Sequence, residues 1–310
     1  MSLTWIITVL CIIVLTLAYV IWNYVRIRKM PEGTADMVDM AAIIRSGANA
    51  FMKTEYKTIA IVVVLISLAL SLFVEKTSGI TFLVGAGMSS CACILGMKSA
   101  TYANVRTANK ARESMSIGDT VKVALCGGSI SGLSVQAFGM LGLVAVLLIW
   151  GGVNHQTDGS GLLVHLQGIN ASVMRVSTYS LGCSLVAMFN RVAGGNYTKA
   201  ADISADILGK IRNDLPEDDS RVPNVIADFI GDNVNDIAGN CSDLLESFVA
   251  TMSATIMIAV IMFQKFSIEQ MFNPTVIFPI LLAGAGLLSC LIGMLYANVK
   301  KMGSDPSHEL

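Results

Sequence analysis

Long apolar stretches separated by shorter polar segments dominate this chain of 310 residues. A helix that crosses the hydrocarbon core of a membrane needs about 20 consecutive, mostly apolar residues. Seven stretches meet this requirement, and they lie at 3–22, 57–75, 79–100, 123–150, 168–190, 226–263 and 275–297. The pattern predicts an all-α polytopic membrane protein, with about seven transmembrane helices in a single transmembrane domain over residues 1–310.

Basic residues mark one side of the membrane. No basic residue precedes the first stretch, whereas Arg26, Arg28 and Lys29 follow it, and further Lys and Arg residues gather in every second loop after that. Cytoplasmic loops carry the excess of basic residues, so the N-terminus is expected outside, in the plasma membrane. Arg175 lies inside the fifth stretch, and we expect its side chain to reach from the outer helix end to the membrane interface.

Composition supports the membrane assignment and excludes one class of partner. Hydrophobic residues make up 54% of the chain, charged residues 14%, and the mean hydropathy is +0.66. The formal net charge is −1. Without an excess of basic residues to neutralise phosphates, the chain is not expected to bind nucleic acid, and its expected surroundings are the lipid bilayer.

Small residues recur in the fourth stretch. Gly128 and Gly132 are four residues apart, and Gly139 continues the series. Small residues at this spacing allow transmembrane helices to approach closely. We therefore expect this face to pack against another helix.

Charged residues cluster in "NRVAGGNYTKAADISADILGK", residues 190–210. In a helix that continues past Thr198, the offsets of three and four residues place Lys199, Asp202 and Asp206 on one face. This face would offer one cation that suits a phosphate beside two carboxylates that suit a metal ion.

A second acidic helix is predicted after Pro223. Its carboxylates fall within a face of roughly 80° over a rise of roughly 27 Å, close to the thickness of a hydrocarbon core. They are Asp228, Asp232, Asp236, Asp243 and Glu246. The deeper pair, Asp243 and Glu246, is expected far from the membrane surface and needs a cationic partner, for which Arg191 and a Lys from another helix are the natural candidates.

Oxygen ligands without His or Cys favour a hard cation, above all Mg²⁺, which commonly binds together with a phosphate oxygen. Mg²⁺ ions beside a Lys would hold a small polyphosphate, and an Asp outside the metal ligands would orient or deprotonate the attacking water. A solvated row of loop carboxylates is the alternative, but the apolar residues around the second helix leave its carboxylates little water to face.

Three motifs resemble the membrane-integral pyrophosphatases, the family of ion pumps driven by pyrophosphate. They are "RVAGGNYTKAADISAD", "PEDDSRVP" and "IADFIGDNVNDIAG", and "SGANAFMKTEYKTIAIV" at 46–62 supports the match. The chain resembles the N-terminal half of this family over most of its length. Glu246, three residues after Asp243, makes it similar to the sodium-pumping bacterial type.

The resemblance implies a role for each matching residue. Lys199 would bind pyrophosphate, Asp236 would activate the water, and three aspartates would hold Mg²⁺, with Na⁺ and K⁺ as candidate activators. The three metal ligands would be Asp202, Asp206 and Asp232. Arg191, Asp243 and Glu246 would form the ion gate below the site. Hydrolysis would occur at the cytoplasmic face, without a phosphoenzyme, and would drive cation export.

The sequence departs from the family pattern at eight positions near these motifs, namely Ala193, Asn196, Ser204, Phe229, Asn235, Asn240, Cys241 and Ser242. None of the charged residues named above is replaced, so the departures concern helix packing. The larger departure is length, because the family fold has sixteen transmembrane helices in one chain, usually as a homodimer. The chain alone is therefore expected to be an inactive half that a C-terminal half would complete.

Alternatives remain open at this point. Proton pumps of some bacteria share the glutamate at the position of Glu246, so the exported ion is Na⁺ or H⁺. A cation channel or carrier without enzymatic activity would use the same carboxylates but would not need Lys199. A vestigial membrane protein would retain the motifs without activity.

Overall fold

A computed structural model describes residues 2–151, 171–212, 214–216, 222, 224–262 and 274–300. Every regular element within these ranges is helical. The α-helices are α1 (Ser2–Arg28), α2 (Ala35–Phe73), α3 (Ser78–Ser114), α4 (Ile117–Val146), α6 (Ala171–Asp206), α7 (Asn224–Asn233), α8 (Asn240–Met262) and α10 (Pro274–Val299). Three π-helical segments, η1 (Leu147–Gly151), η2 (Ile207–Arg212) and η3 (Val234–Gly239), extend or join them. The predicted all-α fold class is confirmed.

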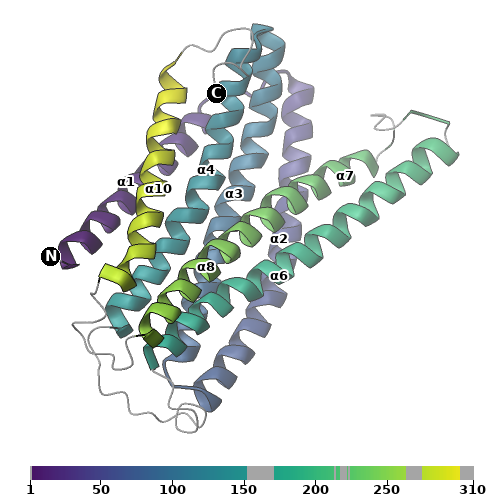
Figure 1. Ribbon diagram of the computed structural model, residues 1–310. Helices are drawn as coiled ribbons and strands as arrows, with labels where there is room; N and C mark the ends of the chain where they lie inside the picture. Colours follow the sequence, from purple (N-terminus) through teal and green to yellow (C-terminus); the bar gives the residue numbers. More distant parts are fainter. Residues whose placement is uncertain are drawn as a thin grey trace.

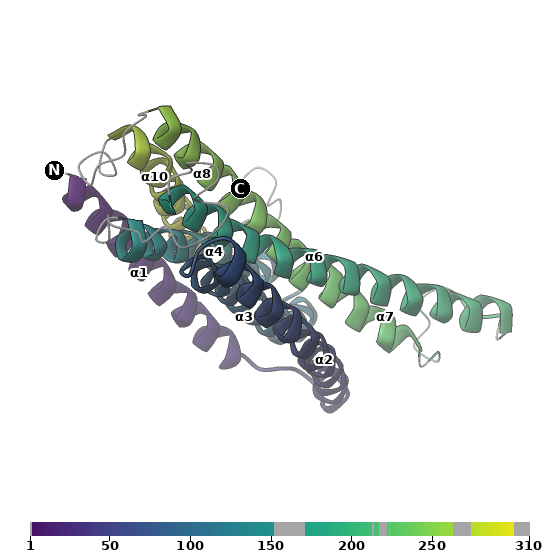
Figure 2. The same ribbon diagram turned by 90° about the horizontal axis from the view of Figure 1, so that it is seen from below.

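The helices form a bundle from which one pair projects. Helices α1, α4, α8 and α10 enclose the main core, where Ile13, Met140, Leu245 and Leu287 are almost fully buried. Helix α3 packs against α2, α4 and α6 (Figure 1). The C-terminal part of α6 and the antiparallel α7 extend side by side beyond the other helices in both views (Figure 2). Much of the predicted functional segment therefore lies on this projecting pair.

Six helical stretches are long and apolar enough to cross a membrane, namely α1, α2, α3, α4 with η1, the stretch from α7 into α8, and α10. The fifth predicted stretch is helical where it is described, in α6, but α6 is too polar to count among the six. Its Val176, Tyr179 and Cys183 are buried against neighbouring helices. A helix that is covered by protein needs less apolar surface than one that faces lipid.

The predicted boundaries differ from the observed ones mainly because the helices continue beyond the apolar stretches. Helix α2 begins at Ala35, far before the predicted start at residue 57, and α3 continues to Ser114. The predicted span 226–263 is divided among α7, η3 and α8. Residues 168–170 and 263, at two ends of the predicted spans, lie outside the described residues, as does most of the motif "PEDDSRVP".

The packing predicted for Gly128 and Gly132 is not found among the described residues. Within those ranges, a methyl group added at either position would meet no atom within 4 Å. The neighbouring Gly127 packs closely instead, because an added methyl would crowd Ala103, and its carbonyl accepts a hydrogen bond of 3.0 Å from Ser99 Oγ. Gly139 packs as predicted, with Val249 Cγ2 3.1 Å from the position of an added methyl.

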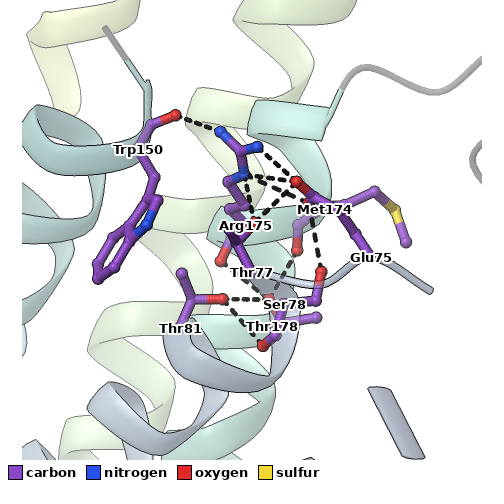
Figure 3. A network of polar contacts seen from close by, with 8 residues as sticks. All are labelled: Glu75, Thr77, Ser78, Thr81, Trp150, Met174, Arg175 and Thr178. Carbon is purple, nitrogen blue, oxygen red and sulfur yellow. Dashed lines mark hydrogen bonds and ion pairs between the residues drawn. The ribbon is translucent and has the colours of Figure 1, made fainter. Parts of the chain in front are cut away.

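The expectation that Arg175 extends to the membrane interface is wrong. Its side chain is only 5% exposed and forms an ion pair with Glu75, which is 4% exposed. The guanidinium also donates to Thr77 Oγ1 at 2.9 Å and to the carbonyl of Trp150 (Figure 3). Because a partner carboxylate lies within reach inside the bundle, the arginine turns inward. This network joins the turn between α2 and α3 to the end of η1 and the first turns of α6.

Candidate active site along α6 and α7

Glycines bring α6 and the segment from α7 to α8 into backbone contact. Thr198 Oγ1 donates to the carbonyl of Gly231 at 2.7 Å, and a methyl added at Gly231 would lie only 2.9 Å from Thr198 Cα. Four residues earlier on α6, a methyl added at Gly194 would lie 3.3 Å from Asn235 Cα. Four residues earlier again, the carbonyl of Asn190 faces Gly239. The two segments therefore run antiparallel with matched steps, which fixes the level of each charged residue along the contact.

The second acidic segment is not one regular helix. Between α7 and α8, six residues form the π-helix η3, and the backbone N–H of Asn240 donates to the carbonyl of Asn235, five residues earlier. A π-helical turn holds an additional residue and rotates everything after it relative to a continuous α-helix. The predicted single face of five carboxylates is therefore interrupted at Asp236, which lies inside η3.

The cluster at the projecting end of α6 consists of two pairs of a lysine with an aspartate. Lys199 Nζ lies 3.4 Å from Asp202 Oδ2, so the predicted offset of three residues brings these side chains together. Asp206 instead pairs with Lys210, at 3.1 Å. The Lys199 side chain is 76% exposed and the Asp202 side chain 42% exposed. An exposed pair of this kind leaves the ammonium accessible to an anion.

The predicted site carboxylates of α7 and η3 lie beside Lys199 or further along the contact toward α8. Thr198 is hydrogen-bonded to Gly231, so the residues that follow them, Lys199 and Asp232, lie at nearly the same position along the two neighbouring helices. Asp232 and Asp236 are both exposed, and Asn235 Nδ2 donates to Asp236 Oδ1 at 3.3 Å. The contact thus places the predicted substrate-binding cation, one predicted metal ligand and the predicted water-activating carboxylate along one short stretch.

The predicted ion gate lies further along the contact, toward the N-terminal part of α6. Arg191 Nη1 lies 3.7 Å from Asp243 Oδ2 and donates to Asn240 Oδ1. The Arg191 and Asp243 side chains are 52% and 51% exposed. Glu246, one turn beyond Asp243, is half-buried. The predicted pairing of Arg191 with one of the two deeper carboxylates is therefore present, with Asp243 as the partner.

Two residues of this arrangement were not predicted as site members. Lys210 pairs with Asp206, a contact that their spacing of four residues could have indicated. Asn240 binds Arg191, although the sequence marks it only as a departure from a motif. Its side chain reaches Arg191 because η3 ends at the preceding residue, and η3 itself has no signal in the hydrophobic pattern.

The donor atoms suit Mg²⁺, but these residues do not form a closed metal site. Carboxylate oxygens are the ligands that Mg²⁺ prefers, and Asp202, Asp206 and Asp232 supply only such atoms. Within the described ranges, however, no three His, Cys, Asp or Glu side chains come close enough together to hold a metal ion. Further ligands would have to come from substrate, water or another segment.

Comparison with a protein-family model decides the relationship. The model described as "Inorganic H+ pyrophosphatase" matches residues 14–309, which is nearly the whole chain. The chain belongs to this family. The resemblance that the acidic motifs indicated is thereby confirmed, and the relatives are pyrophosphate-energized ion pumps.

Individual members of the family match over most of the chain. A K⁺-stimulated pyrophosphate-energized sodium pump of Thermotoga maritima is 45% identical over 301 residues, which cover 93% of the chain and 42% of that pump. A K⁺-insensitive pyrophosphate-energized proton pump of Moorella thermoacetica is 32% identical over 294 residues, which cover 94% of the chain and 40% of the pump. A putative K⁺-stimulated sodium pump of Clostridium tetani is 36% identical over 299 residues, with coverages of 96% and 40%. The chain therefore spans about two fifths of the length of these relatives.

Proposed function

We propose that this chain supplies the N-terminal half of a pyrophosphate-energised cation pump. The observation that carries the proposal is the row of charges along the contact of α6 with α7, η3 and α8. Lys199 beside Asp202 lies at one end of the row, and Arg191 beside Asp243 lies further along it. A cation among carboxylates suits an anionic substrate, whereas a carrier for bare cations has no need of Lys199.

The proposed chemistry is direct hydrolysis of pyrophosphate. Lys199 holds a phosphate oxygen, and Asp236 accepts a proton from the attacking water. The water oxygen forms a bond to one phosphorus, the bridging P–O bond breaks, and two phosphates leave. Asp202, Asp206 and Asp232 would hold Mg²⁺, which would neutralise the charge of the pyrophosphate oxygens.

The proposed transport path begins where the hydrolytic site ends. Release of the proton and of the two phosphates changes the charge next to η3, and the pair of Arg191 with Asp243 lies within two helical turns of it. Glu246 then passes the exported ion onward. We propose Na⁺ as this ion, supported by the position of Glu246 and by the 45% identity to a sodium pump, and K⁺ as an activator.

Orientation and assembly follow from the same proposal. The ends of α1 and α3 that carry Arg28 and Arg112, and the C-terminal end of α6, would face the cytoplasm of a cell whose plasma membrane holds the chain. The exposed side of Lys199 and Asp202 would contact a C-terminal half, which would complete the substrate site. The completed unit would form a homodimer.

Hydrolysis of pyrophosphate tests the proposal. Membranes that contain this chain alone are compared with membranes that also contain a separately expressed C-terminal half of a close homologue. Asp236→Asn is the test variant, and Asp39→Asn, an exposed aspartate on α2, is the matched control. We expect activity only when both halves are present, lost in Asp236→Asn and kept in Asp39→Asn.

Other outcomes separate the alternatives. Activity of this chain alone would contradict the proposed need for a second half. Sodium uptake without hydrolysis would support a carrier, and neither activity in folded preparations would support a vestigial protein. Sodium and proton uptake into inverted vesicles distinguish the exported ion, and a Glu246→Asp variant tests whether its carboxylate sets the choice.

A further inference from the structure

A cavity of about 320 Å³ lies away from the candidate active site, between the end of α1, the C-terminal part of α3 and the first turns of α4. It is lined by Arg26, Met30, Pro31, Arg106, Asn109, Lys110, Glu113, Asp119, Lys122 and Val123. None of these residues belongs to α6, α7 or α8. The cavity is therefore a separate feature of the fold, large enough for a small polar group.

Positive charge prevails in this cavity, since four basic side chains line it against two carboxylates. Arg106 is held inside the protein, where it forms an ion pair of 2.9 Å with Glu32 and donates to the carbonyls of Met30 and Tyr102. Lys110 lies 4.0 Å from Asp119, at the outer limit of an ion pair. These two cations are thus already partly neutralised by the protein.

The other two basic residues, Arg26 and Lys122, retain N–H groups that can bind an anion. Arg26 donates through Nη1 to Asn298 Oδ1 at 3.0 Å, and a guanidinium has five N–H donors. Lys122 is half-buried and forms no ion pair with any residue that the structure describes. A half-buried ammonium without a carboxylate favours an anion beside it.

The cavity lies at the ends of the apolar stretches of α1 and α4, where lipid headgroups are expected. Lys122 directly precedes the apolar part of α4, and Arg26 lies in the last turn of α1. The Arg26 guanidinium lies 5.6 Å from the centre of the Trp22 ring, and Trp22 is 52% exposed. Tryptophan and basic residues with apolar bodies gather at this boundary in membrane proteins.

We propose that this cavity binds the phosphate group of an anionic phospholipid. Arg26 and Lys122 donate to the phosphate oxygens, and Met30, Pro31 and Val123 contact the glycerol backbone. The acyl chains run along the exposed side of α1, past Val25 and Ile21. This apolar path favours a lipid over a soluble phosphate, which would gain nothing from it. Basic pockets between helix ends are a recognised setting for lipid headgroups.

Native mass spectrometry of the full chain in detergent tests this proposal, with phosphatidylglycerol and phosphatidylcholine as probes. The test variant is Arg26→Gln with Lys122→Gln. Its matched control is Lys29→Gln with Lys53→Gln, because both lysines are exposed and do not line the cavity. We expect one tightly held phosphatidylglycerol, with affinity about five-fold weaker for each cavity cation removed and little changed in the control.

Three results would overturn the proposal. Equal retention of phosphatidylcholine would show that the charge of the headgroup is not recognised. Equal losses in the test and control variants would show a general charge effect instead of a site. Displacement of the lipid by millimolar inorganic phosphate would show a site for free anions. Since Arg26 also bonds to Asn298, Lys122→Gln alone, with an expected five-fold loss, keeps the test decisive if the double variant fails to fold.

Discussion

Arg175 and Glu75 form an ion pair in which both side chains are about 95% buried, although one hundred residues separate them in the sequence. Nε of Arg175 lies 3.0 Å from Oε1 of Glu75, and the guanidinium also binds Thr77 and the carbonyl of Trp150. Three chain segments therefore meet at one side chain, namely the turn between α2 and α3, the end of η1 and the start of α6. The pair holds together the helix ends on the side of the bundle opposite to the basic termini of α1 and α3.

Removal of one partner of this pair is expected to destabilise the chain strongly. Arg175→Met leaves the Glu75 carboxylate buried without its cation, and breaking buried pairs in this way costs about 3 to 5 kcal/mol. The double variant Glu75→Gln with Arg175→Met leaves no uncompensated charge and should recover most of the loss. Unfolding in detergent of the parent, both single variants and the double variant measures this coupling. Additive losses would show that the two residues act separately.

The contact of Thr198 with Gly231 is expected to tolerate no side chain. Gly231→Ala places a methyl 2.9 Å from Thr198 Cα, so α7 must move away from α6. Overpacking of this kind typically costs about 1 to 3 kcal/mol. We expect a lower unfolding temperature and, with the second half present, a larger loss of pyrophosphate hydrolysis, because Lys199 and Asp232 shift relative to each other.

Gly286→Ala on α10 is the matched control for this variant, since an added methyl there meets no atom of the described residues within 4 Å. It should leave both stability and hydrolysis nearly unchanged. A Gly231→Ala protein with the stability and activity of Gly286→Ala would contradict the close contact of α6 with α7.

Lys199→Gln should separate a binding role from a structural one. The ion pair with Asp202 is largely exposed, and exposed pairs contribute little to stability, so the unfolding temperature should not change. In the completed pump, loss of a hydrogen bond to a charged phosphate should raise KM for pyrophosphate roughly tenfold or more. Lys57→Gln, an exposed lysine on α2, is the control. An unchanged KM would remove Lys199 from the proposed substrate site.

The sequence predicts the helices, the family and the contact of Lys199 with Asp202, because each depends on local pattern. Apolar stretches of membrane length indicate helices. The spacing of three residues between Lys199 and Asp202 predicts that they are in contact, and they lie 3.4 Å apart. The motifs around Asp206 and Asp232 identify the family from residue order alone. What is predicted correctly here requires no knowledge of which helices are neighbours.

The predictions that fail depend on tertiary neighbours. Arg175 turns inward because Glu75, from a distant turn, supplies a partner that spacing cannot indicate. Gly127 packs against Ala103 while Gly128 does not, and a difference of one residue on a helix is a rotation of about 100°. The π-helix at Asp236 likewise cannot be predicted from a hydrophobic period of 3.6 residues, although it determines which of the following side chains contact Arg191.

Glu32, in the segment between α1 and α2, predicts a dependence of stability on pH. Two hydrogen bonds from Arg45, at 2.9 and 3.1 Å, hold the pKa of Glu32 below its usual value, and the nearby charge of Arg106 adds to this while partial burial opposes it. A lowered folded-state pKa means that the stabilisation is complete above the unfolded-state pKa of about 4.3 and is lost as pH falls through the folded-state value.

Glu32→Gln should therefore be less stable than the parent by a constant amount from about pH 8 to pH 5, and the difference should shrink below about pH 4. Unfolding temperatures across this range measure it, with Glu113→Gln, an exposed acid on α3, as the control. A difference that persists unchanged to pH 3, or one that appears only in acid, would contradict the role assigned to Arg45.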